Sequence, residues 1–287
     1  MRRLNYQLKQ LCKSNRDGSY GTQVQRERVL TLIANQLHDL GFRQMHARSL
    51  RPKHVEALVK HWMVSAIAVG TIKNRMAALR WWAAKVNKKN VIARSNDHYG
   101  IPRRQYANSA NRATTLASEQ LKRITDPYIR MSLELQRAFG LRREEAIKIR
   151  LHLADKGDSL CLKPSWTKGG RAREVPIRTA SQRAILDKAR ELGGKGSLIP
   201  GDRNYKQQKN RYEGQCIRAG LSRMHGLRHA YAQRRLEELT GFLAPLAGGP
   251  DRAALSADER ALDKKARAVI SAELGHNRTA ITRVYLG

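Results

Sequence analysis

The residues of this sequence that could carry out chemistry are a set of basic residues and one tyrosine. Arginine suits phosphate chemistry because its planar guanidinium grips two oxygens and never deprotonates. Fixed cations of this kind stabilise the charge that builds up on phosphate oxygens when a nucleophile attacks. Taken one at a time, each of these residues also has an ordinary explanation as a surface or core group. The set comprises Arg142, Lys168, His225, Arg228, His276 and Tyr285.

Other chemistries fit the sequence less well. His225 and His229 are four residues apart, but no third ligand accompanies them, which argues against a metal site. Glu144 and Glu145 form one local pair rather than the convergent carboxylates of a two-metal nuclease. The GKGS segment at residues 194–197 lacks the spacing of a phosphate-binding loop. We therefore expect neither a metal nor another cofactor.

Charge is the dominant feature of the composition. The 287 residues include 56 lysines and arginines against 24 acidic residues, which gives a formal net charge of +32. Such a field attracts polyanions, so nucleic acid is the expected partner, with a ribosome-like or generally basic protein as the alternative. The cysteines contain no CxxC pair, and no apolar stretch is long enough to cross a bilayer. The composition therefore predicts a cytoplasmic protein without a membrane partner.

Residues 1–98 are predicted to form a helical domain. One-sided helical stripes are expected at Leu30, Ile33, Leu37 and Leu40, and at Ile72, Met76, Leu79, Ala83 and Val86. A further helix is expected to begin at Pro52. Residues 99–114 are polar and nearly free of apolar spacing, and they are predicted as a basic linker. Candidate DNA contacts in this part of the chain, which are otherwise a solvated basic surface, are Lys73, Arg75, Arg80, Arg103 and Arg104.

Residues 115–287 have a mixed pattern. Two short strands are expected at residues 159–166 and 172–177, joined by a turn at residues 167–171 in which Gly169 and Gly170 supply backbone freedom. The segment EEAIKIRLHL after Arg142 is expected to be a continuous helix, and helical patterns dominate from residue 179 onward. The predicted fold class is mainly α with a small antiparallel β-sheet, in two domains.

In their order along the chain, these segments resemble the tyrosine recombinases, also called phage-type integrases. The resemblance spans residues 116–287, and the residues before the linker are similar, more loosely, to the core-binding domain of that family. It implies a helical core-binding domain at residues 1–98 and an α+β catalytic domain at residues 115–287. The motifs that carry it are Gly140-Leu141-Arg142 with Glu145, Lys168 ahead of Val175-Pro176-Ile177, His225-x-x-Arg228, and Leu274-Gly275-His276 with Tyr285 nine residues later.

The resemblance implies a phosphate-binding role for three of these residues. Arg142 and Arg228 would hold the two non-bridging oxygens of a scissile phosphate, and His276 would donate a further hydrogen bond. Glu145, one helical turn after Arg142, is expected to hold that guanidinium in place. No metal is needed in such a site, because the cations belong to the protein.

The remaining residues would handle the covalent step. Tyr285 would be the nucleophile, and His225 would either accept its proton or position it. Lys168, in the hairpin turn, would protonate the leaving 5′-oxygen. His229 lies within the motif and is expected to be structural. The resemblance implies a 3′-phosphotyrosine intermediate, which conserves the energy of the broken bond so that no ATP is required.

Two features depart from the family pattern. Arg228 and His276 are separated by 48 positions, and the additional residues, around 238–266, are interpreted as a surface insertion that is either an elaborated loop or a partner contact. Only two residues follow Tyr285 in this sequence, whereas family members commonly extend a helix that docks on a neighbouring protomer. Cyclic exchange of such tails is therefore in doubt.

The sequence thus favours a site-specific DNA recombinase or integrase of a phage or other mobile element. A type IB-like topoisomerase, which shares the chemistry, and a non-catalytic basic DNA-binding protein are the alternatives. The resemblance implies double-stranded DNA as partner, a homo-oligomer on DNA with a tetrameric synapse, and accessory DNA-bending or directionality proteins as further candidates. The expected location is the bacterial cytoplasm, in association with the nucleoid.

Overall fold

The chain divides into two compact units, Met1–Gln105 and Tyr106–Gly287. The computed structural model describes residues 2–104, 110–276 and 278–287. Residues 105–109, within the linker predicted at 99–114, lie outside the described residues, so this part of the linker stays a prediction. Each unit is described by itself below.

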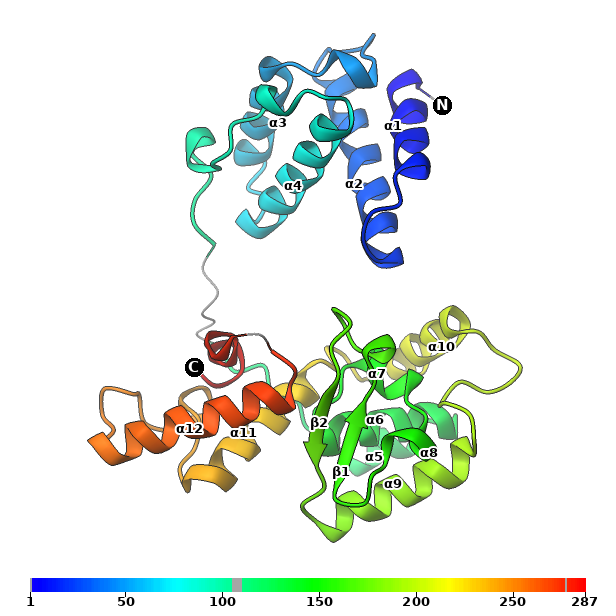
Figure 1. Cartoon of the computed structure of the whole chain (residues 1–287), viewed down its shortest axis with the longest axis vertical. Helices are drawn as coiled ribbons and strands as arrows, with labels where there is room; N and C mark the ends of the chain where they lie inside the picture. The colour runs from blue at the N-terminus through cyan, green and yellow to red at the C-terminus, as the bar shows by residue number, and fades with distance from the viewer. Residues whose placement is uncertain (1, 105–109, 277) are drawn as a thin grey trace. The chain divides into compact units, whose positions relative to one another are not determined.

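The first unit is a helical bundle (Figure 1), and two tryptophans lie in its core. Trp62 and Trp82 are both fully buried. Their indole N–H groups are satisfied, because Trp62 donates to Gln36 Oε1 at 2.9 Å and Trp82 to the Ala47 carbonyl at 2.8 Å. The helices of this unit are α1 (Arg3–Ser14), α2 (Tyr20–Asp39), α3 (Pro52–Val64) and α4 (Val69–Lys85).

The apolar stripes of the sequence lie where the bundle packs. In α2 and α4 the buried positions include Leu30, Ile33, Leu37, Ile72, Met76, Leu79 and Ala83. Leu40 belongs to the first predicted stripe, but it is 37% exposed because α2 ends at Asp39. Pro52 is the first residue of α3, where its missing N–H costs no helical hydrogen bond.

The second unit is mostly helical and carries one two-stranded sheet, which confirms the predicted fold class. The strands β1 (Ser159–Leu162) and β2 (Arg173–Pro176) pair antiparallel, with Leu160 opposite Val175 and Leu162 opposite Arg173. The helices are α5 (Ser118–Lys122), α6 (Pro127–Phe139), α7 (Arg143–Lys148), α8 (Leu151–Ala154), α9 (Ala180–Gly193), α10 (Tyr205–Arg218), α11 (Gly226–Thr240), α12 (Ala257–Glu273) and α13 (Arg283–Leu286).

The turn between the strands has the predicted residues. Gly169 and Gly170 both have positive φ, of 85° and 65°. The Thr167 hydroxyl closes the turn, since it donates to the Arg171 carbonyl at 2.6 Å and accepts from the Arg171 N–H at 2.9 Å. The hairpin therefore presents Lys168 on an exposed, tightly closed loop.

The expectation of one continuous helix through EEAIKIRLHL is wrong. α7 ends at Lys148 and α8 begins at Leu151. The apolar residues Ile147, Ile149 and Leu151 are spaced by two, so one helical face cannot bury all three. The break buries Ile147 in one apolar cluster and the other two in a second cluster.

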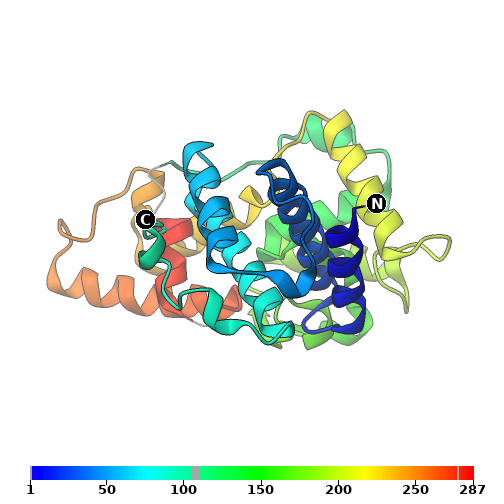
Figure 2. The same ribbon diagram turned by 90° about the horizontal axis from the view of Figure 1, so that it is seen from above.

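The segment predicted as a surface insertion lies between α11 and α12, which pack side by side (Figures 1 and 2). Residues 238–266 comprise the end of α11, a turn at Pro245–Ala247 and the first part of α12. Ala244 and Ala266 from this segment are buried in the main core of the unit. Most of the segment is exposed, and these two alanines attach it to the core, so its interpretation as a surface insertion stays a prediction.

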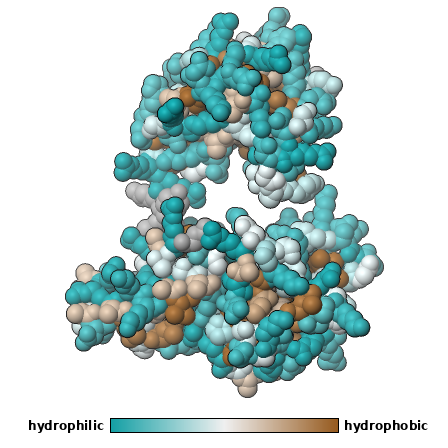
Figure 3. Space-filling view, viewed as in Figure 1, coloured by the Kyte–Doolittle hydropathy of each residue, from teal (hydrophilic) through white to brown (hydrophobic). Residues whose placement is uncertain are grey.

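The surfaces of both units are predominantly hydrophilic in the view of Figure 3. This agrees with the high content of lysine and arginine. Among the described residues, no helix combines the length and the apolar character that crossing a membrane requires.

Gly140 ends α6 in the left-handed conformation, with φ of 60°. A Cβ atom at this position would lie 2.5 Å from Cδ1 of Tyr231, on α11. Only glycine allows α6 and α11 to approach so closely at a turn of this kind. The same turn leads directly into Leu141 and Arg142, so this close approach positions a candidate catalytic residue.

We predict that Gly140→Ala destabilises the second unit more than Gly220→Ala does. Gly220 also has a positive φ, of 70°, but a Cβ atom added there would meet nothing within 4 Å. The two variants share the backbone strain, and only the first adds an overpacking cost of about 1–3 kcal/mol. Calorimetric unfolding of the two variants measures the difference, and equal destabilisation would contradict the packing argument.

Candidate active site

The ring of Tyr285 is enclosed by three histidines. It lies 4.5 Å from the ring of His229, 5.3 Å from that of His276 and 6.1 Å from that of His225, measured between centroids. The His276 ring is nearly parallel to it, at 23°. The phenol oxygen lies 3.4 Å from Nε2 of His225. Tyr285 is only 6% exposed, so its hydroxyl is directed by packing rather than free in solvent.

Arg228 is a fully buried cation beside this tyrosine. Its Nη1 donates to the Gly140 carbonyl at 2.6 Å, and its Nη2 donates to the Leu274 carbonyl and lies 3.4 Å from Nε2 of His276. Its guanidinium carbon is 5.9 Å from the centre of the Tyr285 ring. Arg228 thus joins the turn before Arg142 to the turn before His276.

Arg142 is the residue immediately before α7, and Glu145 holds it there. The Glu145 carboxylate accepts from the Arg142 backbone N–H at 2.6 Å and from Arg142 Nη1 at 2.7 Å. Glu145 is fully buried, whereas the Arg142 side chain stays partly exposed. The supporting role predicted for Glu145 therefore has a direct geometric basis.

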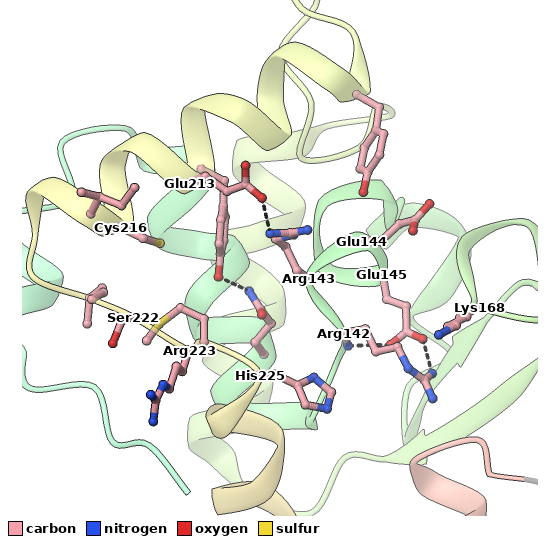
Figure 4. Close-up of a pocket in the computed structure, with 16 residues that line it drawn as sticks. Arg142, Arg143, Glu144, Glu145, Lys168, Glu213, Cys216, Ser222, Arg223 and His225 are labelled. Atoms are coloured by element: carbon pink, nitrogen blue, oxygen red, sulfur yellow. Dashed lines mark hydrogen bonds and ion pairs between the residues drawn. The ribbon is translucent and has the colours of Figure 1, made fainter. Parts of the chain in front are cut away.

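Arg142, Lys168 and His225 come from separate segments and converge on one cavity (Figure 4). The cavity has a volume of about 710 Å³. Lys168, in the hairpin turn, and His225, which precedes α11, are both exposed. Tyr285 does not line the cavity, but its hydroxyl lies 3.4 Å from Nε2 of His225. Three of the six predicted catalytic residues therefore line the cavity, and Arg228 and His276 lie beside Tyr285.

Burial, together with neighbouring positive charges, keeps the histidines of the site neutral. Burial, with the charges of Arg228 and Arg142, lowers the pKa of His276 to about 3. Burial and the neighbouring His225 lower the pKa of His229 to about 4. Partial desolvation and the same two arginines lower the pKa of His225. A neutral His225 with its ring proton on Nδ1 has a lone pair on Nε2, the atom that faces the tyrosine hydroxyl.

Three buried polar atoms of the site have no hydrogen-bond partner among the described residues. They are Nε of Arg228, Nδ1 of His276 and Nδ1 of His229. Buried polar atoms without partners cost free energy, so such atoms often mark a place where a ligand binds.

The last helical turn is held by its own chain. Gln233 on α11 donates to the Tyr285 carbonyl at 3.1 Å. Arg267 on α12 donates to the Gly287 carbonyl at 2.8 Å, and its Nε is fixed by the buried carboxylate of Asp263. Leu286 is fully buried. The helices that flank the predicted insertion thus anchor the tyrosine in the same protomer.

Sequence reasoning missed a group of buried charges behind the site. Arg173 on β2 pairs with both oxygens of Glu145, at 2.9 and 2.6 Å. The carboxylate of Glu273 accepts from the Tyr231 hydroxyl at 2.7 Å and from Arg235 at 3.0 Å. The available signal was the alternation of REVPI, which places Arg173 on the same strand face as the buried Val175.

The predicted DNA contacts of the first unit have different surroundings. Arg80 donates to the Ala93 carbonyl and to Oδ1 of Asn96, at 3.1 and 2.8 Å, and so holds the segment after α4. Arg75 lies over the ring of Trp62, 5.4 Å from its centre. Lys73 is partly exposed on α4. Arg103 and Arg104 are exposed and line a hollow beside the N-terminus of α4.

No cluster of three or more histidine, cysteine, aspartate or glutamate side chains suited to a metal is found within residues 2–104, 110–276 and 278–287. The cations of the site are side chains of the protein itself.

The arrangement places a tyrosine among three histidines and beside the buried Arg228, and comparisons with known proteins identify the family. Residues 1–91 match the family model of the phage integrase N-terminal domain, and residues 104–234 match that of the integrase domain. A search of curated proteins gave no significant sequence match. The chain belongs to the tyrosine recombinase family and is a site-specific recombinase.

Solved structures have the same fold. A lambda integrase dimer bound to a COC′ core site aligns over 98% of this chain and 95% of its own, with a TM-score of 0.60 and 16% identity. XerH recombinase bound to palindromic difH substrate aligns over 99% and 81%, with a TM-score of 0.58 and 15% identity. The Tn1549 transposon integrase, in complex with circular intermediate DNA, aligns over 100% and 96%, with a TM-score of 0.52 and 14% identity.

We predict that the stability of the second unit decreases as the pH falls below about 6.5. A histidine with an unfolded pKa near 6.5 and a folded pKa near 4 binds protons first in the unfolded chain, which favours unfolding at low pH. His229 has this property, since its folded pKa is about 4. It contributes at most about 1.4 kcal/mol per pH unit to the slope. Urea unfolding at several pH values between 7 and 5 measures the free energy of unfolding as a function of pH. This free energy should fall less steeply with decreasing pH in His229→Gln than in the wild-type chain, and an equally steep fall would contradict the burial argument.

Proposed function

We propose that this recombinase cleaves one DNA strand through attack of Tyr285 on the scissile phosphate. The Tyr285 oxygen forms a bond to phosphorus, and the bond from phosphorus to the 5′-oxygen breaks. The phenol proton passes to His225, and Lys168 protonates the leaving oxygen. The products are a 3′-phosphotyrosine link and a free 5′-hydroxyl, and a second strand reverses the step through its own hydroxyl.

The observation that carries this proposal is the contact between Tyr285 and His225. Their 3.4 Å separation supports the roles of nucleophile and base, because such contacts are often longer before substrate binds than the hydrogen bond that forms with it. The surrounding cations suit the phosphate, because Arg142 opens onto the cavity while Arg228 offers an unpartnered Nε from behind the tyrosine. His276, whose Nδ1 is also unpartnered, supplies the third hydrogen bond to the phosphate oxygens.

The partners in this proposal are double-stranded DNA and further copies of the chain. The solved relatives include a lambda integrase dimer on a core site and a lambda integrase tetramer on a Holliday junction. We extend this to the present chain as a tetrameric synapse on two sites. Accessory DNA-bending or directionality proteins are candidates on family resemblance alone, as is a bacterial, nucleoid-associated location on a mobile element.

Tyr285→Phe is predicted to abolish the covalent protein–DNA adduct, because phenylalanine has no nucleophilic oxygen. Incubation with nicked duplex that carries candidate sites, followed by denaturation, measures the adduct. Tyr205→Phe is the matched control, since Tyr205 borders the same cavity and this variant should still form adduct. An adduct that persists in Tyr285→Phe would overturn the mechanism.

The same assay on supercoiled DNA separates the alternatives. Recombination between two sites supports the recombinase, whereas relaxation of any plasmid without recombination supports a type IB-like topoisomerase. Absence of any adduct with the wild-type chain would favour a non-catalytic DNA-binding protein.

DNA affinity is predicted to fall steeply with salt, because neutralised phosphates release counterions. The formal charge of +32 supports this expectation. Arg103→Gln should reduce the slope of log affinity against log salt by about 1, if this exposed arginine contacts a phosphate. Titrations of labelled duplex at several salt concentrations measure the slope, and a flat response would contradict the charge argument.

A further inference from the structure

Arg173, at the start of β2, is a buried arginine that does not border the cavity. Its side chain is only 4% exposed. Its Nη1 and Nη2 donate to the two oxygens of Glu145, at 2.9 and 2.6 Å, and its Nε donates to the Glu273 carbonyl at 2.8 Å. One guanidinium therefore joins three segments: the strand that follows the Lys168 hairpin, the start of α7, and the end of α12.

The carboxylate of Glu145 is shared between two arginines. Each of its oxygens accepts one hydrogen bond from the Arg173 fork and one from Arg142, through Nη1 on one oxygen and the backbone N–H on the other. Burial raises the pKa of this carboxyl, but the two guanidiniums outweigh burial and lower it to about 2. Two positive charges thus face one negative charge, and the group keeps a net positive charge.

The turn that precedes His276 packs against the side chain of Arg173. Gly275 has a positive φ of 66°, and a Cβ atom there would lie 2.9 Å from Cδ of Arg173. The hydrogen bond from Arg173 to the Glu273 carbonyl holds the backbone two residues earlier. Glycine is therefore required at position 275 for two reasons: the turn needs a positive φ, and a Cβ atom would collide with the side chain of Arg173.

We propose that Arg173 is a positioning residue of strand cleavage: it orients Arg142 and His276 toward one phosphate and prevents Glu145 from neutralising Arg142. The inference rests on the proposed function of the site. Arg173 acts through Glu145 and the turn before His276, and its nitrogens are already engaged within the protein.

The single negative charge of Glu145 is shared between Arg142 and Arg173. With Arg173 in place, Glu145 divides its hydrogen bonds, and Arg142 presents the rest of its guanidinium to the cavity. Without Arg173, the buried carboxylate has only Arg142 as a partner, so the local charge falls from +1 to 0. The attraction between Arg142 and a phosphate in the cavity then weakens, although Arg142 itself is unchanged.

The test measures single-turnover cleavage of a nicked duplex at saturating DNA by the full chain. Arg173→Met should lower the cleavage rate by about 10- to 100-fold, the usual cost of a misplaced catalytic group. The DNA dissociation constant should change by less than about 3-fold, because the whole basic surface still binds the backbone. Arg173→Lys keeps the charge but cannot bridge both Glu145 oxygens and the Glu273 carbonyl, and it should lose about 10-fold.

A second substrate separates the electrostatic role from a structural one. A methylphosphonate at the scissile position removes one phosphate charge and so reduces the need for a cationic Arg142. The ratio of wild-type to Arg173→Met cleavage should therefore be smaller on the methylphosphonate than on the phosphodiester. An equal ratio on the two substrates would overturn the electrostatic role.

Arg183→Met controls for the loss of an ion pair with a buried carboxylate. Arg183 on α9 pairs with Asp155 at 2.6 Å, and neither residue borders the cavity. This variant should cleave at the wild-type rate. If the wild-type chain cleaves and Arg173→Met or Arg173→Lys cleaves at the same rate, the inference is refuted and the proposed function stands. If the wild-type chain forms no adduct, the proposed function itself is refuted. If Arg173→Met does not fold, Arg173→Lys tests the positioning role by its rate on the phosphodiester, and Arg173→Gln, which removes the charge, tests the electrostatic role by its ratio on the two substrates.

Discussion

The site depends on how several cations are kept close together without an equal number of anions. Two unit charges 4 Å apart repel by about 4 kcal/mol at an effective dielectric constant of 20. The buried carboxylate of Glu145 offsets this repulsion for Arg142 and Arg173. Arg228 pairs with no carboxylate within the part of the chain that the structure describes, and the main-chain carbonyls of Gly140 and Leu274 hold it instead. The carbonyl dipoles of these two turns therefore stabilise the positive charge of Arg228.

Burial, with the same cations, determines the protonation of the residues around the tyrosine. Because burial and positive neighbours lower the pKa values of His225, His229 and His276, these rings are neutral at physiological pH. A neutral ring can accept a proton, and an imidazolium cannot. Burial and these charges thus leave a lone pair free on His225, as its proposed role of proton acceptor requires.

The candidate site could be assembled from the sequence because each candidate catalytic residue lies in a short local motif. Arg142 follows a glycine turn, Lys168 lies in a glycine-rich hairpin, and His225 and Arg228 are one helical turn apart. The break between α7 and α8 and the burial of Ala244 and Ala266 were not predictable in this way. Both depend on which apolar residues the tertiary packing selects, and local periodicity does not contain that information.

Arg173 shows a second limit of sequence reasoning. Its partners, Glu145 and the Glu273 carbonyl, are 28 and 100 positions away along the chain. An arginine on the inward face of a strand indicates that a partner exists, but it does not identify the partner. The fold supplies that partner by bringing β2 against α7 and the end of α12.

The most direct test of the account is to find the atom that joins the chain to DNA. The trapped adduct is digested with trypsin and nuclease, and the modified peptide is sequenced by mass spectrometry. The account predicts a nucleotide attached through its 3′-phosphate to Tyr285, in a peptide that begins at Val284, and a released strand that ends in a 5′-hydroxyl. A nucleotide on a different residue, or a link through a 5′-phosphate, would contradict it.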